Sequence, residues 1–278
     1  MKRSLTTLVM LACLGLAIGA PAPAGAKKAP RDLLPNLVPL PSETIRMGDT
    51  EPYPGSVSQP SIAINGCRVD EMAEQNARRC LRFDTAVANF GRGPVELRYV
   101  TGSSSTDPNA PLTQRIYRSD GTFRERLASP SEFHPIHGHY HYKDFSISRL
   151  WRATSKGKRL GKSAIRSGKK NGFCFEDTAA VRQDSRRRYS CLDYEPGTEG
   201  IDRVTGISVG WKDVYTYTLN GQFIEITGVP DGYYLLTTTV DPDRTVTETT
   251  HADNTSSQLI QICGDTATIV EPGPPVAC

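Results

Sequence analysis

The chain has 278 residues, of which 37% are hydrophobic and 23% are charged, with 24 glycines and 20 prolines. This composition excludes a collagen-like chain, a coiled coil and a wholly disordered chain, and it fits one globular domain or at most two small ones. The formal net charge is +3, and Lys2 and Arg3 in the N-terminal leader contribute two of the positive charges. The remainder is close to neutral, which argues against nucleic acid as a main partner, because phosphate tracking needs a strong basic surplus.

The N-terminus is typical of a signal peptide. A charged start is followed by an apolar run over residues 8–18, and residues 24–26 (AGA) form an A-x-A cleavage signal. We therefore expect residues 1–26 to be a signal peptide that is cleaved after Ala26, and the mature protein to be secreted to the extracellular space. A lipid-attachment signal ending at Cys13 is the alternative, and it leaves only a very short apolar run. Beyond the first 30 residues no membrane span is expected, because no stretch has the about 20 apolar residues that one needs.

The mature chain divides into a short lead-in and one folded domain. Residues 27–35 are basic and flanked by prolines, and we expect a flexible segment there, followed by the domain over residues 36–278. The domain shows strand-type alternation and turn signals, including SDG at residues 119–121, whereas helical periodicity is weak and best around residues 68–79. The predicted strands cover residues 80–87, 94–100, 115–117, 122–123, 139–151, 222–226, 233–240 and 257–263. We predict an all-β fold, a β-sandwich-like single domain with long loops and disulfides.

Six cysteines remain after removal of the leader, and an even number in an exported chain indicates disulfides. Six cysteines allow 15 connectivities, and the sequence does not choose among them. The simplest scheme pairs sequence neighbours and closes three short loops, each worth about 3 kcal/mol. A metal–thiolate site is the rival interpretation, but the chain has no C-x2-C spacing. The neighbour scheme gives Cys67–Cys80, Cys174–Cys191 and Cys263–Cys278.

A basic segment covers residues 152–170, where eight lysines and arginines face no acidic residue. A solvated basic hairpin is the simpler interpretation, and a surface for a polyanion is the alternative.

Four of the five histidines fall within residues 134–141. On a strand, alternate side chains share a face, so His137, His139 and His141 are expected to point the same way and to converge on one ion. Three neutral imidazoles suit copper or zinc and leave positions open for water, oxygen or substrate. His134 is out of this register and is assigned an accessory role. The spacing alone does not choose between the two metals.

Several motifs, in chain order, resemble those of the lysyl oxidase family. Residues 137–141 (HGHYH) are similar to its copper motif H-x-H-Y-H, and residues 170–178 (KNGFCFEDT) are similar to its K-x-x-F-C-L-E-D-T. The resemblance covers most of the mature chain, from about residue 34 to residue 263, and ordered motifs are more specific than the histidines alone. The further matches are residues 34–38 (LPNLV), 81–83 (LRF), 89–91 (NFG), 206–208 (GIS), 213–215 (DVY), 222–227 (QFIEIT) and 231–236 (DGYYLL).

The resemblance implies a copper-dependent amine oxidase, with His137, His139 and His141 as copper ligands. Lys170 and Tyr215 would form the family's cofactor, lysine tyrosylquinone. Lys169 is the neighbouring competitor, but Lys170 keeps the family spacing to the cysteine at position 174.

The implied reaction converts a primary amine, on peptidyl lysine or a small molecule, to an aldehyde. Oxygen is consumed, and hydrogen peroxide and ammonia are released. A carboxylate is expected to remove the α-proton of the substrate as general base. Asp144 and Asp213 are the two candidates by proximity in sequence, and the sequence does not choose between them.

A second ion site is also implied by the resemblance. Glu248, Asp253 and Asn254, with Asn36 from the other end of the domain, resemble an acidic calcium site of the family, and oxygen-rich ligation suits calcium. Asn36 and Thr250 stand where the family has acids, which weakens the charge of the site. A turn rich in Asp and Asn is the simpler interpretation.

The chain also departs from the family pattern. Ile136 and Trp211 stand where the family has cysteines, so the disulfide framework is expected to be thinner. The stretch from Lys170 to Tyr215 is longer than in the animal enzymes. Two rival functions stay open, a metal-binding β-sandwich without catalysis and a zinc hydrolase built on the same three histidines. The hydrolase explains neither Lys170 nor Tyr215.

Overall fold

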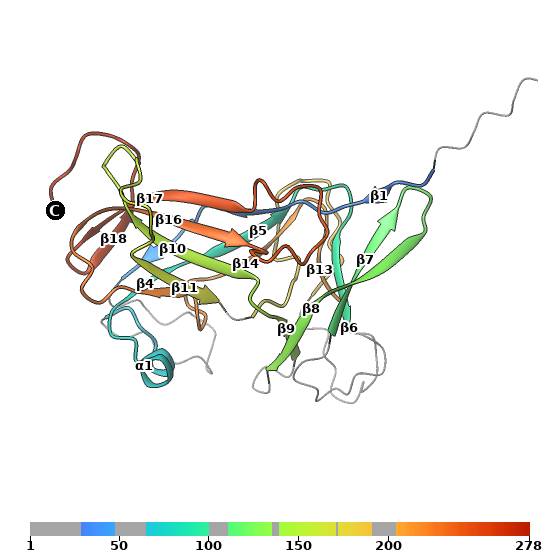
Figure 1. Ribbon diagram of the computed structural model, residues 1–278, viewed down its shortest axis with the longest axis horizontal. Coiled ribbons are helices and arrows are strands. Elements are labelled where there is room, and N and C mark those ends of the chain that lie inside the picture. The colour runs from blue at the N-terminus through green and yellow to red at the C-terminus, as the bar shows by residue number, and fades with distance from the viewer. Residues whose placement is uncertain (1–28, 48–64, 100–110, 135–138, 171, 191–203) are drawn as a thin grey trace, which may run out of the picture. The chain divides into compact units, whose positions relative to one another are not determined.

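The computed structural model describes residues 29–47, 65–99, 111–134, 139–170, 172–190 and 204–278 (Figure 1). Residues Arg31–Cys278 form one compact unit, and the strand pairings among its described residues are all antiparallel. The prediction of an all-β fold is confirmed, with four sheets among the described residues rather than the two of a simple sandwich. No helix in the described part of the chain has the length and apolar character to cross a membrane.

The first sheet has the order β13-β6-β7-β8-β9, with β1 beside β7. The predicted hairpin at residues 119–121 is confirmed, and it joins the two longest strands of this sheet. Its turn is closed by the side chain of Asp120, which accepts the Thr122 N–H at 3.1 Å, and by Gly121 at φ 84°. The strands are β1 (Asp32–Leu33), β6 (Val95–Tyr99), β7 (Pro111–Arg118), β8 (Phe123–His134), β9 (His139–Tyr142) and β13 (Val204–Ile207).

The start of the compact unit lies inside the segment 27–35, where we expect a flexible lead-in. Asp32 and Leu33 pair with the edge of β7. The Asp32 carboxylate also contacts the guanidinium groups of Arg118 at 3.2 Å and Arg124 at 2.7 Å, and the hydrogen bond from Arg124 lowers the pKa of Asp32. These partners lie about 90 residues away, so the sequence around Asp32 carries no sign of the pairing.

The second sheet has the order β11-β10-β16-β17-β18, and two smaller sheets follow the orders β12-β14-β5-β2 and β15-β4-β3. Their strands are β2 (Leu37–Leu40), β3 (Ile45–Arg46), β4 (Cys80–Phe83), β5 (Thr85–Asn89), β10 (Ser146–Arg152), β11 (Arg166–Lys170), β12 (Ala179–Ala180), β14 (Trp211–Tyr215), β15 (Phe223–Glu225), β16 (Gly232–Val240), β17 (Thr255–Cys263) and β18 (Thr266–Ile269).

Two predicted strands are each divided between two sheets. The alternation over residues 80–87 is broken at Asp84, which separates β4 from β5. The alternation over residues 139–151 is broken at the turn Lys143-Asp144, where Asp144 has φ 59° and separates β9 from β10. Because both halves of each segment keep the period of a strand, the alternation gave no sign of the break.

An aromatic cluster fills the core beneath the ends of β9 and β14. The Phe145 ring lies 4.6 Å from that of Phe175 and 5.1 Å from that of Phe173, and Tyr142 stacks on Phe175 at 5.7 Å. Burying such a side chain stabilises the fold by about 1.5–3 kcal/mol. A second cluster lies between the second sheet and the sheet β15-β4-β3, and it includes Leu81, Leu150, Ile224, Leu236, Ile260 and Ile262.

The helix α1 (Val69–Gln75) lies within the segment where helical periodicity is best, and the disulfide Cys67–Cys80 brackets it. The disulfide Cys263–Cys278 is also present, so two of the neighbour pairings are confirmed. Cys174 is disulfide-bonded as well, but its predicted partner Cys191 lies outside the described residues.

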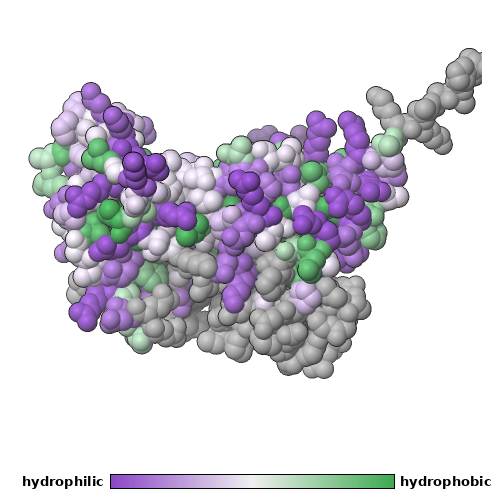
Figure 2. All heavy atoms as spheres, in the orientation of Figure 1, coloured by the Kyte–Doolittle hydropathy of each residue, from purple (hydrophilic) through white to green (hydrophobic). Residues whose placement is uncertain are grey.

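On the face seen in Figure 2, hydrophilic side chains surround small, separate apolar patches.

Candidate functional site

Strand β9 carries two of the three predicted copper ligands. His139 and His141 stand two positions apart on it, and in the register with β8 they are opposite His134 and Glu132. His137 lies outside the described residues. The backbone therefore puts His134, the predicted accessory residue, directly across from His139.

Strand β11 brings Lys170 alongside the chain that follows these histidines. Lys170 is the register partner of Ser146, and Phe173 forms an isolated antiparallel bridge with Tyr142. The bridge has both hydrogen bonds, with the Tyr142 N–H donating to Phe173 at 2.6 Å and the Phe173 N–H donating to Tyr142 at 3.1 Å. Lys170 and Phe173 thus lie beside Ser146 and Tyr142, in the part of the chain that directly follows His141.

Tyr215, the last residue of β14, contacts the same segment. Its ring centroid lies 4.5 Å from that of Phe173. Its hydroxyl group accepts the backbone N–H of Cys174 at 2.6 Å and donates to the carbonyl oxygen of Cys174 at 2.9 Å. Tyr215, the predicted tyrosine, is therefore hydrogen-bonded to Cys174, which follows the predicted lysine, Lys170, by four residues.

Asp213 lies two positions before Tyr215 on β14, on the same face of the strand. Its side chain is 1% exposed, Oδ1 accepts the Thr178 hydroxyl at 3.3 Å, and Oδ2 has no hydrogen-bond partner in the described structure. Burial, and then the negative charge of Glu176, raise the pKa of Asp213 well above its usual range. Burial and the charge of Asp213 likewise raise the pKa of Tyr215.

Asp144, the other predicted base, is half-buried in the left-handed turn between β9 and β10. It follows His141 by three residues, so it lies close to the predicted copper ligands along the chain. The charges of Asp213 and Glu176 act on the Tyr215 hydroxyl group. The two predicted bases thus lie on different elements, and the charge of Asp213 acts on the tyrosine.

Asp177 is a supporting residue that sequence reasoning did not single out. Its carboxylate is fully buried and accepts the backbone N–H groups of Arg188 at 2.8 Å, Tyr189 at 3.1 Å and Ser208 at 2.7 Å, and the Ser208 hydroxyl at 2.7 Å. It thereby ties the segment after Cys174 to the turn before β14. Its signal in the sequence was the acidic pair inside the KNGFCFEDT match.

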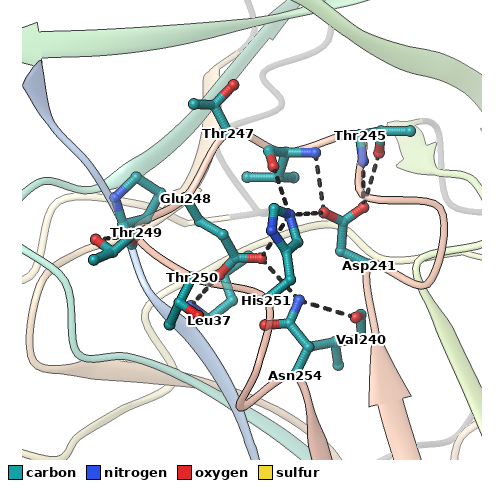
Figure 3. Close-up of polar contacts among 12 residues, drawn as sticks. Leu37, Val240, Asp241, Thr245, Thr247, Glu248, Thr249, Thr250, His251 and Asn254 are labelled. Carbon is teal, nitrogen blue, oxygen red and sulfur yellow. Dashed lines mark hydrogen bonds and ion pairs between the residues drawn. The ribbon is translucent and has the colours of Figure 1, made fainter.

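The four predicted calcium ligands come together from the two ends of the domain, and Figure 3 shows two of them, Glu248 and Asn254. Glu248 Oε2 accepts the backbone N–H of Leu37 and Oε1 accepts the Asn254 amide, both at 2.8 Å. The Asn36 amide donates to Asp253 Oδ2 at 2.8 Å. The Oδ1 atoms of Asn36, Asp253 and Asn254 are buried without a hydrogen-bond partner in the described structure, and such oxygens are the donors that calcium prefers.

Two further residues of this region, Asp241 and His251, were not predicted from the sequence. Asp241 and His251 lie next to Glu248, with His251 Nε2 at 3.5 Å from Glu248 Oε1 and at 3.7 Å from Asp241 Oδ2. His251 is the one histidine outside the segment 134–141, and a lone histidine has no spacing that predicts a site.

Comparison with known proteins gives a match to the family model described as lysyl oxidase, over residues 113–271. Lysyl oxidase homolog 3 of Homo sapiens is 32% identical over 178 residues, which cover 64% of this chain and 18% of the relative. Protein-lysine 6-oxidase of Gallus gallus is 34% identical over 124 residues, 44% of this chain and 26% of the relative. That of Sus scrofa is 32% identical over 124 residues, 44% of this chain and 43% of the relative. The match thus covers less than half of the length of each of these relatives.

Proposed function

Because the chain belongs to the lysyl oxidase family, we propose that it is a copper-dependent amine oxidase. Its substrates are primary amines, on peptidyl lysine or on small molecules, and its products are an aldehyde, hydrogen peroxide and ammonia. The observation that carries the proposal is the meeting of three parts of the chain at the Phe173 bridge. These are β9 with its histidines, the segment that begins at Lys170, and Tyr215.

The residues present fit the two groups that such an enzyme needs. His137, His139 and His141 would hold copper, since imidazole nitrogens suit this ion. Lys170 and Tyr215 would supply the atoms of lysine tyrosylquinone. When formed, this cofactor with copper supplies the two-electron oxidation of the amine by oxygen, and the protein supplies binding, orientation and proton transfer.

In this proposal Asp213 is the group that accepts the substrate α-proton, through its unpartnered Oδ2 atom. A carboxyl group with a raised pKa suits proton transfer near neutral pH. Asp213 shares a strand face with Tyr215, which supports its choice over Asp144. Asp177, with its four donors, holds the neighbouring backbone in place.

The proposal is tested on the secreted chain expressed with copper. We expect quinone absorbance in the visible range and a crosslinked peptide that joins Lys170 to Tyr215. Lys170→Arg and Tyr215→Phe should lose both signals and the amine-dependent release of peroxide. Lys169→Arg is the matched control, because it changes the neighbouring lysine in the same way and should keep them.

Three outcomes would contradict parts of the proposal. Unmodified Tyr215 in fully copper-loaded protein would favour a metal-binding module without catalysis. Peroxide release that survives Tyr215→Phe would contradict the cofactor assignment and leave the oxidase open. Loss of the signals in Lys169→Arg but not in Lys170→Arg would show that Lys169, not Lys170, forms the crosslink.

We also propose that residues 1–26 direct export and are cleaved after Ala26, that oxygen is the co-substrate, and that neither nucleic acid nor a membrane span takes part.

Calcium is proposed as a structural ion held by Asn36, Glu248, Asp253 and Asn254. Support for calcium comes from the buried, unpartnered oxygens of three of these residues.

A further inference from the structure

The segment that joins β16 to β17 carries a second group of metal-ligating atoms, apart from the histidine motif. His251 Nε2 lies 3.5 Å from Glu248 Oε1, 3.7 Å from Asp241 Oδ2 and 3.2 Å from the carbonyl oxygen of Val246. The ligand atoms of the three side chains all lie within 4.8 Å of one another. Figure 3 shows the imidazole ring between the two carboxylates.

These spacings are close to those of a filled site. Two atoms bound to one zinc ion at about 2.0–2.1 Å lie roughly 2.9–3.4 Å apart. The measured distances from Nε2 to the three oxygens are 3.2, 3.5 and 3.7 Å, so the side chains would seat an ion after small shifts.

The charge of this group is unbalanced without an ion. Asp241 is 2% exposed and Glu248 is 7% exposed. In the described part of the chain, His251 is the only cationic side chain that pairs with either of them. Two buried carboxylates therefore face one imidazole, and burying charge without compensation is costly. A divalent cation compensates both carboxylates.

The surrounding donors hold the carboxylates in position for such an ion. Asp241 Oδ1 accepts the Thr245 N–H at 2.8 Å and the Thr245 hydroxyl at 2.9 Å, while Oδ2 accepts the Val246 N–H at 3.0 Å. The Asn254 amide donates to Glu248 Oε1 at 2.8 Å. Carboxylates that bind metals are oriented by outer hydrogen bonds of this kind. Asn254 itself is 4% exposed, and its amide also donates to the carbonyl oxygen of Val240 at 3.2 Å.

We propose that Asp241, Glu248 and His251, with the Val246 carbonyl oxygen, bind a divalent transition ion of the zinc or manganese class. This site shares Glu248 with the proposed calcium ligands, and its imidazole nitrogen favours a transition ion, because calcium prefers oxygen atoms alone. His251 is partly exposed, so the ion can enter from solvent. The proposal does not depend on the oxidase activity, since none of these residues belongs to the histidine motif, Lys170 or Tyr215.

The test is a zinc count on the copper-loaded, full-length mature chain. The protein is equilibrated with Zn²⁺ in the presence of excess Ca²⁺, passed through a desalting column and analysed for metals by mass spectrometry. The parent chain should retain one zinc ion beyond its copper. His251→Gln should weaken zinc binding by at least about tenfold while its copper content stays unchanged. Asp243→Asn is the matched control, because it changes an exposed carboxylate in the same segment and should leave zinc binding unchanged.

A second variant keeps the test decisive if His251→Gln folds poorly. Asp241→Asn keeps an Oδ1 acceptor for Thr245, and it should also lose zinc, together with the zinc-induced rise in melting temperature. Equal zinc retention in the parent chain and both variants would overturn the proposal, as would the absence of retained zinc in the parent chain. Displacement of the zinc by excess Ca²⁺ would overturn the assignment to a transition ion.

Discussion

At the scale of single residues, the most informative group is the Asp213 carboxyl. It is buried, it lacks a partner at Oδ2, and its charge acts on the hydroxyl group of Tyr215. A buried polar atom without a partner costs about 1–3 kcal/mol, so its retention needs a reason. Transfer of the substrate proton is a reason that fits both its position and its raised pKa.

Replacing Asp213 tests this role. Asp213→Asn keeps the shape of the side chain and removes the base, so kcat/KM for a primary amine should fall by roughly 10²–10⁴-fold. Quinone absorbance and copper content should stay at the level of the parent chain. Asp184→Asn, at an exposed carboxylate, is the control and should leave kcat/KM unchanged. A comparable loss in Asp144→Asn with full activity in Asp213→Asn would transfer the role to Asp144.

The same carboxyl group predicts how stability depends on pH. Its pKa is raised in the folded protein, whereas the unfolded chain has a pKa of about 3.9. Between the two values the folded state binds the extra proton, so stability falls as pH rises through this window. Asp213→Asn should therefore unfold at higher urea concentration than the parent chain at pH 8, by about 1–3 kcal/mol, and with no difference at pH 4. A difference that is the same at both pH values would show that the carboxyl group does not take up a proton on folding.

At the scale of elements, a buried ion pair between α1 and β4 holds the loop that follows Tyr215. Arg82 is fully buried, and its guanidinium group donates to Glu71 at 2.5 Å and to the carbonyl oxygens of Tyr217 and Leu219, both at 2.6 Å. Glu71 in turn accepts the Gly221 N–H at 3.1 Å. The matched motif LRF thus has a structural explanation, because its arginine fixes the loop that leaves β14.

Removal of this arginine should destabilise the fold strongly. Arg82→Met removes the buried guanidinium group that pairs with Glu71, and breaking such a buried pair typically costs about 3–5 kcal/mol. Chemical denaturation followed by fluorescence measures the change. Arg46→Met, at the exposed register partner of Arg82 on β3, is the control and should change the unfolding free energy by less than about 0.5 kcal/mol. A small effect of Arg82→Met would show that the loop is held by other contacts.

At the scale of the whole molecule, hydrogen bonds join the beginning of the domain to the segment between its last long strands. Asn36 and Leu37 contact Asp253 and Glu248 across more than 200 residues. Such a connection closes the fold, and an ion bound there would strengthen it by binding only the folded state.

Calcium should therefore raise the melting temperature of the copper-loaded protein. At a concentration about a hundredfold above Kd the gain is about 2.7 kcal/mol, or roughly 5–10 °C for a domain of this size. Asp253→Ala should abolish the rise, whereas Asp243→Ala, at an exposed carboxylate, should retain it. A melting temperature that does not respond to calcium would favour the simpler interpretation, a turn rich in Asp and Asn.

The sequence by itself determined the β class and the hairpin at residues 119–121, because alternation and turn residues are local signals, and its simplest cysteine pairing predicted two of the disulfides. It also indicated the family, through motifs that keep their order along the chain. Only the tertiary structure decided where the strands over residues 80–87 and 139–151 break, that the charge of Asp213 acts on Tyr215, and that Asp241 and His251 stand beside Glu248. Burial and long-range contact create these features, and side chains that meet only after folding leave no periodic pattern in the chain.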